Sequence, residues 1–166
     1  MNYKKTIKEF ENNYSKKETI RLKDMKNRFK YKTDDNSIIY NVYIKSLSPI
    51  QLGLTEINPG NINGEFYMTR GHIHSKKTPE FYILLEGNGI LLMQNNNNVK
   101  SVKLKKGEIT LIPEGHAHRL INIGNKKLKA LTIYQEDSMP NYNIKFKKRF
   151  FKKWEIRIWK LIGKIL

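Results

Sequence analysis

The residues best able to carry out chemistry are four histidines, which occur as two pairs. The first pair is His72 and His74 in the segment GHIHSKKTPEFY, and Glu80 follows six positions after the second histidine. Two imidazoles and a carboxylate are ligands for a divalent metal ion, provided that the fold brings them together. An isolated H-x-H segment is common, so the alternative is two incidental histidines near a surface carboxylate.

The elements that would position these side chains are short strands. Between residues 38 and 134, apolar runs alternate with turn sequences such as NPGNING, NNNN and PEG. Nine runs are expected to be strands: SIIYNVYIKSL, IQLGLTEI, GEFYMTR, EFYILLEG, GILLMQ, VKSVKL, EITLIP, HRLINIG and LKALTIY. No helical pattern interrupts them, which favours an all-β antiparallel barrel or jelly roll.

Strand geometry decides which histidines can act together. Residues two apart in a strand face the same side, so His72 and His74 can present both imidazoles to one cavity. Glu80 opens the next strand, and a hairpin would bring it back alongside them. The second pair, in GHAH, also shares a face, and from spacing alone either His116 or His118 could be a further ligand.

Composition is that of one soluble domain. The chain has 166 residues, of which 39% are hydrophobic and 11% aromatic. It has no cysteine, which excludes disulfides and thiolate chemistry and fits a reducing cytoplasm. The opening MNYKKTIKEFENNYSKKE lacks the apolar stretch of a secretory signal, and no run reaches the roughly 18 apolar residues of a membrane span. A cytoplasmic protein is therefore expected.

The net charge of +17 is concentrated at one end of the chain. Residues 145–166 hold nine Lys or Arg against one acid, Glu155. No helix-turn-helix, zinc-finger or RNA-binding motif accompanies these basic residues, so no nucleic acid is expected as a partner. We expect a polar, helical N-terminal segment over 1–19, a β domain over 20–144 and a basic C-terminal helix over 145–166.

The C-terminal segment has the period of an amphipathic helix. Apolar residues recur at steps of three and four, and most of the lysines fall off that stripe. The stripe consists of Phe146, Phe150, Trp154, Ile158, Leu161, Ile162 and Ile165. A helix with one apolar face, one basic face and tryptophan anchors suits an anionic membrane interface. The alternative is that the stripe packs on the barrel or on a partner subunit.

The two histidine segments resemble the two motifs of the cupin family. The first motif, H-x-H followed by a glutamate, six residues and a glycine, is matched through Gly87, although the spacer before the glutamate is longer than usual. Phe66 stands where the family usually has a glycine before the first histidine. The second motif, G-x5-P-x-G-x2-H-x3-N, is matched at every position: Gly107, Pro113, Gly115, His118 and Asn122.

This resemblance implies the cupin fold, a double-stranded β-helix or jelly-roll barrel. It also implies one divalent metal ion per chain, Fe²⁺, Mn²⁺, Ni²⁺ or Zn²⁺, and it selects His118 over His116 as the last ligand. The implied ligands are His72, His74, Glu80 and His118.

A closer resemblance is to the cupin-type glucose-6-phosphate isomerases of archaea and some bacteria. It runs from about residue 20 to 143 through RLKDM, YNVY, LTEINPG, GEFYMTRGHIH and HRLINIGN, in the family's order. It implies interconversion of glucose 6-phosphate and fructose 6-phosphate. One segment differs from the family's pattern: Pro140 and Asn141 stand where the family has a histidine shortly before a late tyrosine. His116 is a candidate substitute.

The resemblance also implies the residues of a sugar-phosphate site. The implied substrate-binding residues are Thr55, Thr69, Arg70, Gly71, Tyr82 and Tyr142, and the implied catalytic residues are Glu80 and Tyr134. Coordination to a metal weakens a carboxylate as a base. Either Glu80 leaves the metal when substrate binds, or the reaction is a hydride shift. The alternative functions are another cupin enzyme acting on a sugar phosphate or nucleotide sugar, and a sugar-binding cupin without activity.

A homodimer is expected. Cupins of this type usually pair through their barrels, and SIIYNVYIKSL is a long apolar run expected at a sheet edge, where it would otherwise invite aggregation.

Overall fold

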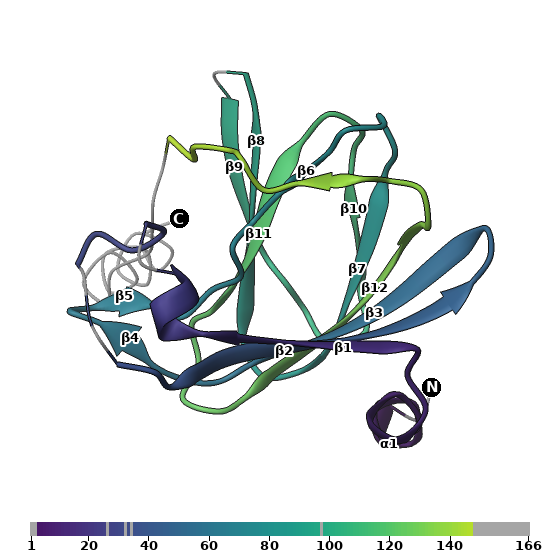
Figure 1. Cartoon of the computed structure of the whole chain (residues 1–166), viewed down its shortest axis with the longest axis horizontal. Coiled ribbons are helices and arrows are strands. Elements are labelled where there is room, and N and C mark those ends of the chain that lie inside the picture. Colours follow the sequence, from purple (N-terminus) through teal and green to yellow (C-terminus); the bar gives the residue numbers. More distant parts are fainter. Residues whose placement is uncertain (1–2, 26, 32, 34, 97, 148–166) are drawn as a thin grey trace, which may run out of the picture.

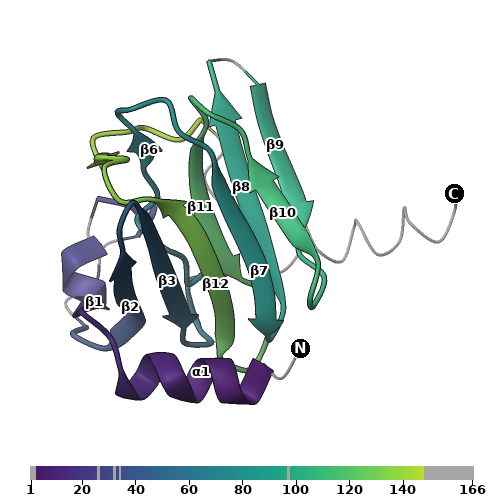
Figure 2. The ribbon, with the colours of Figure 1, turned by 90° about the vertical axis from the view of Figure 1, so that its right-hand side faces the viewer.

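The computed structural model describes residues 3–25, 27–31, 33, 35–96 and 98–147. It is a β barrel made of two main antiparallel sheets that face each other (Figures 1 and 2). The large sheet has the order β1 (Lys16–Arg21), β2 (Ile38–Leu47), β3 (Ile50–Ile57), β12 (Leu128–Gln135), β7 (Glu80–Glu86) and β10 (Ile109–Ile112). The second sheet has the order β11 (Ala117–Asn122), β8 (Gly89–Asn95) and β9 (Asn98–Lys103).

Shorter elements complete the chain. Helix α1 (Tyr3–Asn12) precedes β1, and a 3-10 turn, η1 (Leu22–Met25), follows it. Two short strand pairs are β13 (Pro140–Asn141) with β6 (Ile73–His74), and β4 (Asn61–Ile62) with β5 (Glu65–Phe66). No helix among the described residues is long and apolar enough to cross a membrane. The expected all-β cupin fold with a helical N-terminal lead-in is confirmed.

The alternation of apolar and polar residues in the strands produces two hydrophobic clusters. The larger cluster fills the barrel between the sheets and includes Leu91 and Leu120, both fully buried. The smaller cluster lies on the outside of the large sheet, where Ile7 and Phe10 of α1 pack on residues such as Leu54. This outer helix explains why the outward face of the large sheet also carries apolar residues.

The strand predictions were correct for eight of the nine runs. The exception is GEFYMTR, which forms only β5 and one isolated bridge between Met68 and Ile121. The expectation that SIIYNVYIKSL is an edge strand is wrong. Strand β1, which the sequence did not reveal, pairs with β2 from Lys16 to Arg21 and becomes the edge instead.

The expected C-terminal helix falls largely outside the described residues, since they end at 147. The first residue of its apolar stripe, Phe146, is described and is buried in the main cluster. Its ring lies 4.1 Å from the guanidinium carbon of Arg119. At this one position, the stripe packs on the barrel.

Candidate metal centre and substrate cavity

The fold brings the two histidine pairs together. His74 lies in β6, Glu80 begins β7 and His118 lies in β11. An isolated antiparallel bridge joins the segments, since the His72 N–H donates to the His118 carbonyl at 3.0 Å and the His118 N–H donates to the His72 carbonyl at 2.8 Å. One potential ligand atom from each of the four residues lies within 4.8 Å of the others.

The four side chains surround one carboxylate oxygen. Oε2 of Glu80 lies 2.8 Å from Nε2 of His118, 3.3 Å from Nε2 of His74 and 3.8 Å from Nε2 of His72. Glu80 Oε2 and His118 Nε2 are buried, and neither has a hydrogen bond of acceptable geometry with the described residues. Leaving such atoms unpaired costs about 1–3 kcal/mol each. A divalent metal ion bound by all four residues would satisfy both, so the cluster fits the implied metal.

Hydrogen bonds on the far side of two rings set the tautomer that metal binding needs. Nδ1 of His74 lies 3.1 Å from the Thr78 carbonyl oxygen and 3.0 Å from the Thr78 hydroxyl. Nδ1 of His118 lies 3.1 Å from the carbonyl oxygen of His116. An Nδ1–H that donates to a carbonyl leaves the lone pair on Nε2, which here faces the cluster.

Electrostatics favour the metal-binding protonation states at two of the four residues. Burial, helped by His118, lowers the pKa of His72 to about 3. Burial alone would raise the pKa of Glu80, but the surrounding imidazoles, His118 above all, stabilise the ionised carboxylate and lower its pKa to about 2. His74 behaves differently: burial lowers its pKa, but Glu80 and Thr78 outweigh burial and the net shift is upward. Neutral imidazole and ionised carboxylate are the forms that bind metals.

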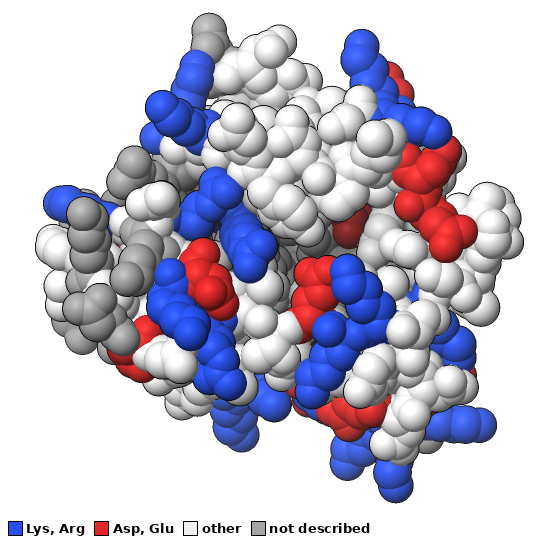
Figure 3. Space-filling model, in the orientation of Figure 1, with Lys and Arg blue, Asp and Glu red and all other residues white. Residues whose placement is uncertain are grey.

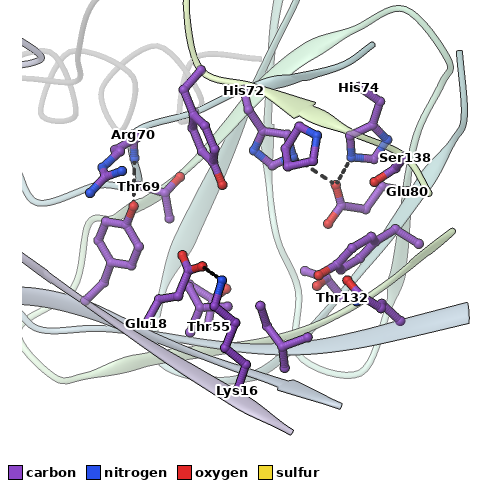
Figure 4. Close-up of a pocket in the computed structure, with 18 of the residues that line it drawn as sticks. Lys16, Glu18, Thr55, Thr69, Arg70, His72, His74, Glu80, Thr132 and Ser138 are labelled. Carbon is purple, nitrogen blue, oxygen red and sulfur yellow. Dashed lines mark hydrogen bonds and ion pairs between the residues drawn. The ribbon is translucent and has the colours of Figure 1, made fainter. Parts of the chain in front are cut away.

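The cluster forms one end of a cavity of about 300 Å³. This is within the size range of small-molecule sites. In the close-up, Thr69 and Arg70 lie at the opposite end from His74 and Glu80 (Figure 4). On the face viewed in Figure 1, basic and acidic side chains lie next to each other around a hollow in the surface (Figure 3). All the substrate-binding and catalytic residues implied by the resemblance line the cavity: Thr55, Thr69, Arg70, Gly71, Glu80, Tyr82, Tyr134 and Tyr142.

The end opposite the metal cluster is suited to an anion. Nε of Arg70 is buried and has no hydrogen-bond partner among the described residues. The Thr69 hydroxyl oxygen accepts a hydrogen bond from the Leu120 N–H at 3.1 Å, so its own hydrogen can be donated to a ligand. The Arg70 guanidinium carbon lies 5.9 Å from the centre of the Tyr142 ring. Cationic and hydroxyl donors therefore converge there.

A glycine joins the two ends. Gly71 has a φ of +72°, a left-handed conformation that side chains disfavour. A Cβ at this position would lie 2.6 Å from the Phe146 ring and 2.9 Å from the His118 carbonyl oxygen. The chain can therefore pass this close to a metal-binding segment only with glycine.

Comparison with known proteins identifies the family. The family profile described as "Glucose-6-phosphate isomerase (GPI)" matches residues 5–154. This chain belongs to the glucose-6-phosphate isomerase family.

Relatives in this family are similar over most of their length. A glucose-6-phosphate isomerase of Thermococcus litoralis is 32% identical over 151 residues, covering 83% of this chain and 80% of the relative. One from Pyrococcus furiosus is 29% identical with the same coverage. Among solved structures, an oxalate decarboxylase of Bacillus subtilis superposes with a TM-score of 0.52 at 22% identity. That match covers 61% of this chain but only 27% of the other, and it supports the fold alone.

The structure adds cavity residues that sequence reasoning missed in this family member. They are Lys16 and Glu18 of β1, Tyr40 of β2, Thr132 of β12 and the buried Ser138. The alternation of Glu18 and Ile20 with exposed residues was the available signal, but it is weak in a six-residue, mostly polar strand.

The suggested role of His116 is not supported. His116 is not among the described residues that line the cavity, and its Nδ1 lies 3.0 Å from the Glu114 carbonyl oxygen. Pro140, at the position of the family's histidine, lines the cavity and pairs with His74 across β13 and β6.

Proposed function

We propose that this protein interconverts glucose 6-phosphate and fructose 6-phosphate with one divalent metal ion per chain. The observation that carries the proposal is a single cavity, in a chain of the glucose-6-phosphate isomerase family, that joins a His₃Glu cluster to an anion-binding end. A hexose phosphate would place its phosphate near Thr69 and Arg70, and its C1 and C2 near the cluster.

The phosphate end holds the substrate through donors of several kinds. We assign phosphate contacts to Thr55, Thr69, Arg70, Gly71 and Tyr142. Charge-assisted hydrogen bonds from a guanidinium are among the stronger polar contacts in proteins. The unpartnered Nε of Arg70 supports its role, because a phosphate oxygen would satisfy that buried donor.

The metal end carries the chemistry. A divalent ion held by His72, His74, Glu80 and His118 would polarise the sugar oxygens and so acidify the C2 proton. The donor set suits Fe²⁺, Mn²⁺, Ni²⁺ or Zn²⁺.

Glu80 is suited to moving the proton. The Glu80 oxygen that faces the three imidazoles is Oε2, and Figure 4 shows the other oxygen pointing away from the histidines. With its pKa lowered to about 2, Glu80 is ionised at neutral pH and able to accept a proton, but it is a weak base, so the reaction depends on the acidification of the C2 proton by the metal. We assign it the removal of the proton from C2 and its return to C1. One oxygen can then serve the metal while the other serves the substrate.

Two tyrosines are suited to the sugar oxygens. Tyr134 of β12 stands opposite Glu80 of β7 in the sheet, and Tyr82 stands opposite Thr132. Burial raises the pKa of both phenols above the ordinary value. We assign Tyr134 a catalytic role, and Tyr82 a substrate contact, as neutral hydroxyls that donate to or accept from the sugar.

A coupled assay for glucose 6-phosphate formation from fructose 6-phosphate tests this proposal. Activity should be lost on chelation and restored by Mn²⁺ or Fe²⁺. The assay repeated with mannose 6-phosphate defines the sugar. If the metal-loaded protein converts no hexose phosphate, the isomerase assignment is wrong and a different cupin reaction on a sugar phosphate takes its place.

We also propose a cytoplasmic homodimer. The outer face of the large sheet supports it, because α1 covers only part of that face. Exposed apolar side chains remain on this face in β7 and β10: Phe81 is 39%, Leu111 49% and Ile109 67% exposed. Phe81 and Leu111 are direct neighbours across β7 and β10. Such contiguous apolar surface is typical of protein interfaces. A monomer mass by light scattering at micromolar concentration would contradict the dimer.

A further inference from the structure

Strand β1 contributes an ion pair to the wall of the cavity. In the register with β2, Lys16 stands opposite Ile44 and Glu18 stands opposite Val42. Val42 in turn stands opposite Thr55 of β3, so Glu18 and Thr55 belong to one row across the sheet. Lys16 and Glu18 line the same cavity as Thr69 and Arg70, and their side chains point into it (Figure 4).

The pair contributes little to folding. Nζ of Lys16 lies 2.6 Å from Oε1 of Glu18, but the two side chains are 65% and 35% exposed. Ion pairs this exposed to solvent add little stability. The neighbouring Lys17 lies with its Nζ 4.9 Å from the ring centre of Tyr43, which belongs to the outer cluster under α1. Of these two adjacent lysines, Lys16 is therefore the one that serves the cavity.

The charges of this pair act on the proposed phosphate subsite. The guanidinium carbon of Arg70 lies 5.9 Å from the ring centre of Tyr142, so these two residues are neighbours. Lys16, Glu18, Arg70 and Tyr142 all line the same cavity. A carboxylate at this place would repel a phosphate unless a cation offset its charge.

We propose that Lys16 is a further phosphate ligand, paired with Glu18 and transferred from that carboxylate to the phosphate when a sugar phosphate binds. The inference rests on the proposed function in placing the phosphate at the end of the cavity where Thr69 and Arg70 lie. A phosphate dianion carries more charge than the carboxylate and offers three oxygens, so it replaces Glu18 as the partner of Lys16. Arg70 and Lys16 then bind the phosphate from different strands.

This arrangement selects for a phosphorylated sugar. A neutral sugar has no group that binds Lys16 more strongly than Glu18 does, so the ion pair stays intact. A dianionic phosphate instead binds Lys16 as a second cation beside Arg70. Glu18 therefore acts as a competing partner, which binds the lysine side chain until a phosphate replaces it.

Binding of inorganic phosphate to the manganese-loaded full-length protein tests the inference. Titration calorimetry would compare the wild type with Lys16→Met, Lys17→Met and Glu18→Gln. Loss of one partly exposed charge-assisted contact should weaken phosphate binding about 3- to 10-fold in Lys16→Met. Lys17→Met, a matched control of the same charge, should stay within about twofold of the wild type. Glu18→Gln should bind phosphate about 2- to 5-fold more tightly, because the competing carboxylate is gone.

Kinetics separate this role from a general structural one. Lys16→Met should raise KM for fructose 6-phosphate by the same factor as the phosphate dissociation constant, with kcat within about twofold. Equal weakening in Lys16→Met and Lys17→Met would reduce the effect to overall charge and overturn the inference. Weaker phosphate binding in Glu18→Gln would also overturn it, since the carboxylate would then not be a competitor.

Failure of the inference and failure of the proposed function give different results. If the wild type turns over no hexose phosphate but Lys16→Met selectively weakens phosphate binding, the isomerase proposal fails and Lys16 remains a phosphate ligand. If the wild type isomerises the sugar and Lys16→Met matches it in KM and phosphate binding, the inference about Lys16 fails and the proposed function stands.

Discussion

Replacing Gly71 with alanine should destabilise the protein and disturb the metal cluster together. The left-handed φ of +72° alone costs an alanine about 1–2 kcal/mol. The added Cβ would also meet the Phe146 ring at 2.6 Å and the His118 carbonyl oxygen at 2.9 Å. Overpacking of this kind adds about 1–3 kcal/mol. The total is about 3 kcal/mol, which in a chain of this length lowers Tm by about 6–12 °C.

Gly115→Ala provides the matched control. Gly115 has a nearly equal φ of +68°, but a Cβ there would have no neighbour within 4 Å among the described residues. It should therefore show only the conformational cost, a fall in Tm of about 3–6 °C. Thermal unfolding followed by circular dichroism gives both values, and metal content measured on the same samples reports on the cluster. If Gly71→Ala is no more destabilised than Gly115→Ala, the close approach of Gly71 to the His118 backbone does not matter for the fold.

Three further predictions concern the metal, α1 and the C-terminal segment. His118→Ala should lose bound metal and His116→Ala should keep it, as measured by elemental analysis after dialysis; full occupancy in both would remove His118 from the ligand set. The hydrogen bond and charge of Lys129 outweigh burial and lower the pKa of Glu11 below its ordinary value of 4.5, so its contribution to stability is present above pH 4.5 and is lost as the pH falls further. In Glu11→Gln the free energy of unfolding should therefore fall less steeply as the pH drops below 4.5, and an unchanged pH dependence would contradict this contact. The full chain should sediment with anionic liposomes at low salt and a chain ending at residue 147 should not; equal behaviour of the two would leave 148–166 without a membrane role.

The fold was largely predictable because its strands carry clear patterns. The apolar runs in β2, β3, β7, β8, β11 and β12 lie between turn sequences, and the structure places them as strands. Strand β1 was missed because KKETIR has only one buried residue, Ile20, and its pairing with β2 is decided by tertiary contacts. GEFYMTR was overpredicted, because after Phe66 the chain meets β11 only at an isolated bridge, Met68 to Ile121, before Thr69 and Arg70 line the cavity.

The candidate site was predictable where the motifs are specific and not elsewhere. The spacing of the second motif singled out His118, and the structure places it beside Glu80 while His116 stays outside the cavity lining. Lys16 and Glu18 were missed because they lie before the first recognisable family motif, RLKDM at 21–25, and look like ordinary solvated charges. Only the register of β1 against β2 shows that these two side chains face the cavity.

A metal titration of isomerase activity tests the central claim most directly. The chain is stripped of metal, Mn²⁺ is added in steps, and both bound metal and formation of glucose 6-phosphate from fructose 6-phosphate are followed. The cluster of His72, His74, Glu80 and His118 predicts activity that rises in proportion to bound metal and levels off at one ion per chain. Full activity in the stripped protein, or no hexose-phosphate isomerisation at one bound ion per chain, would contradict it.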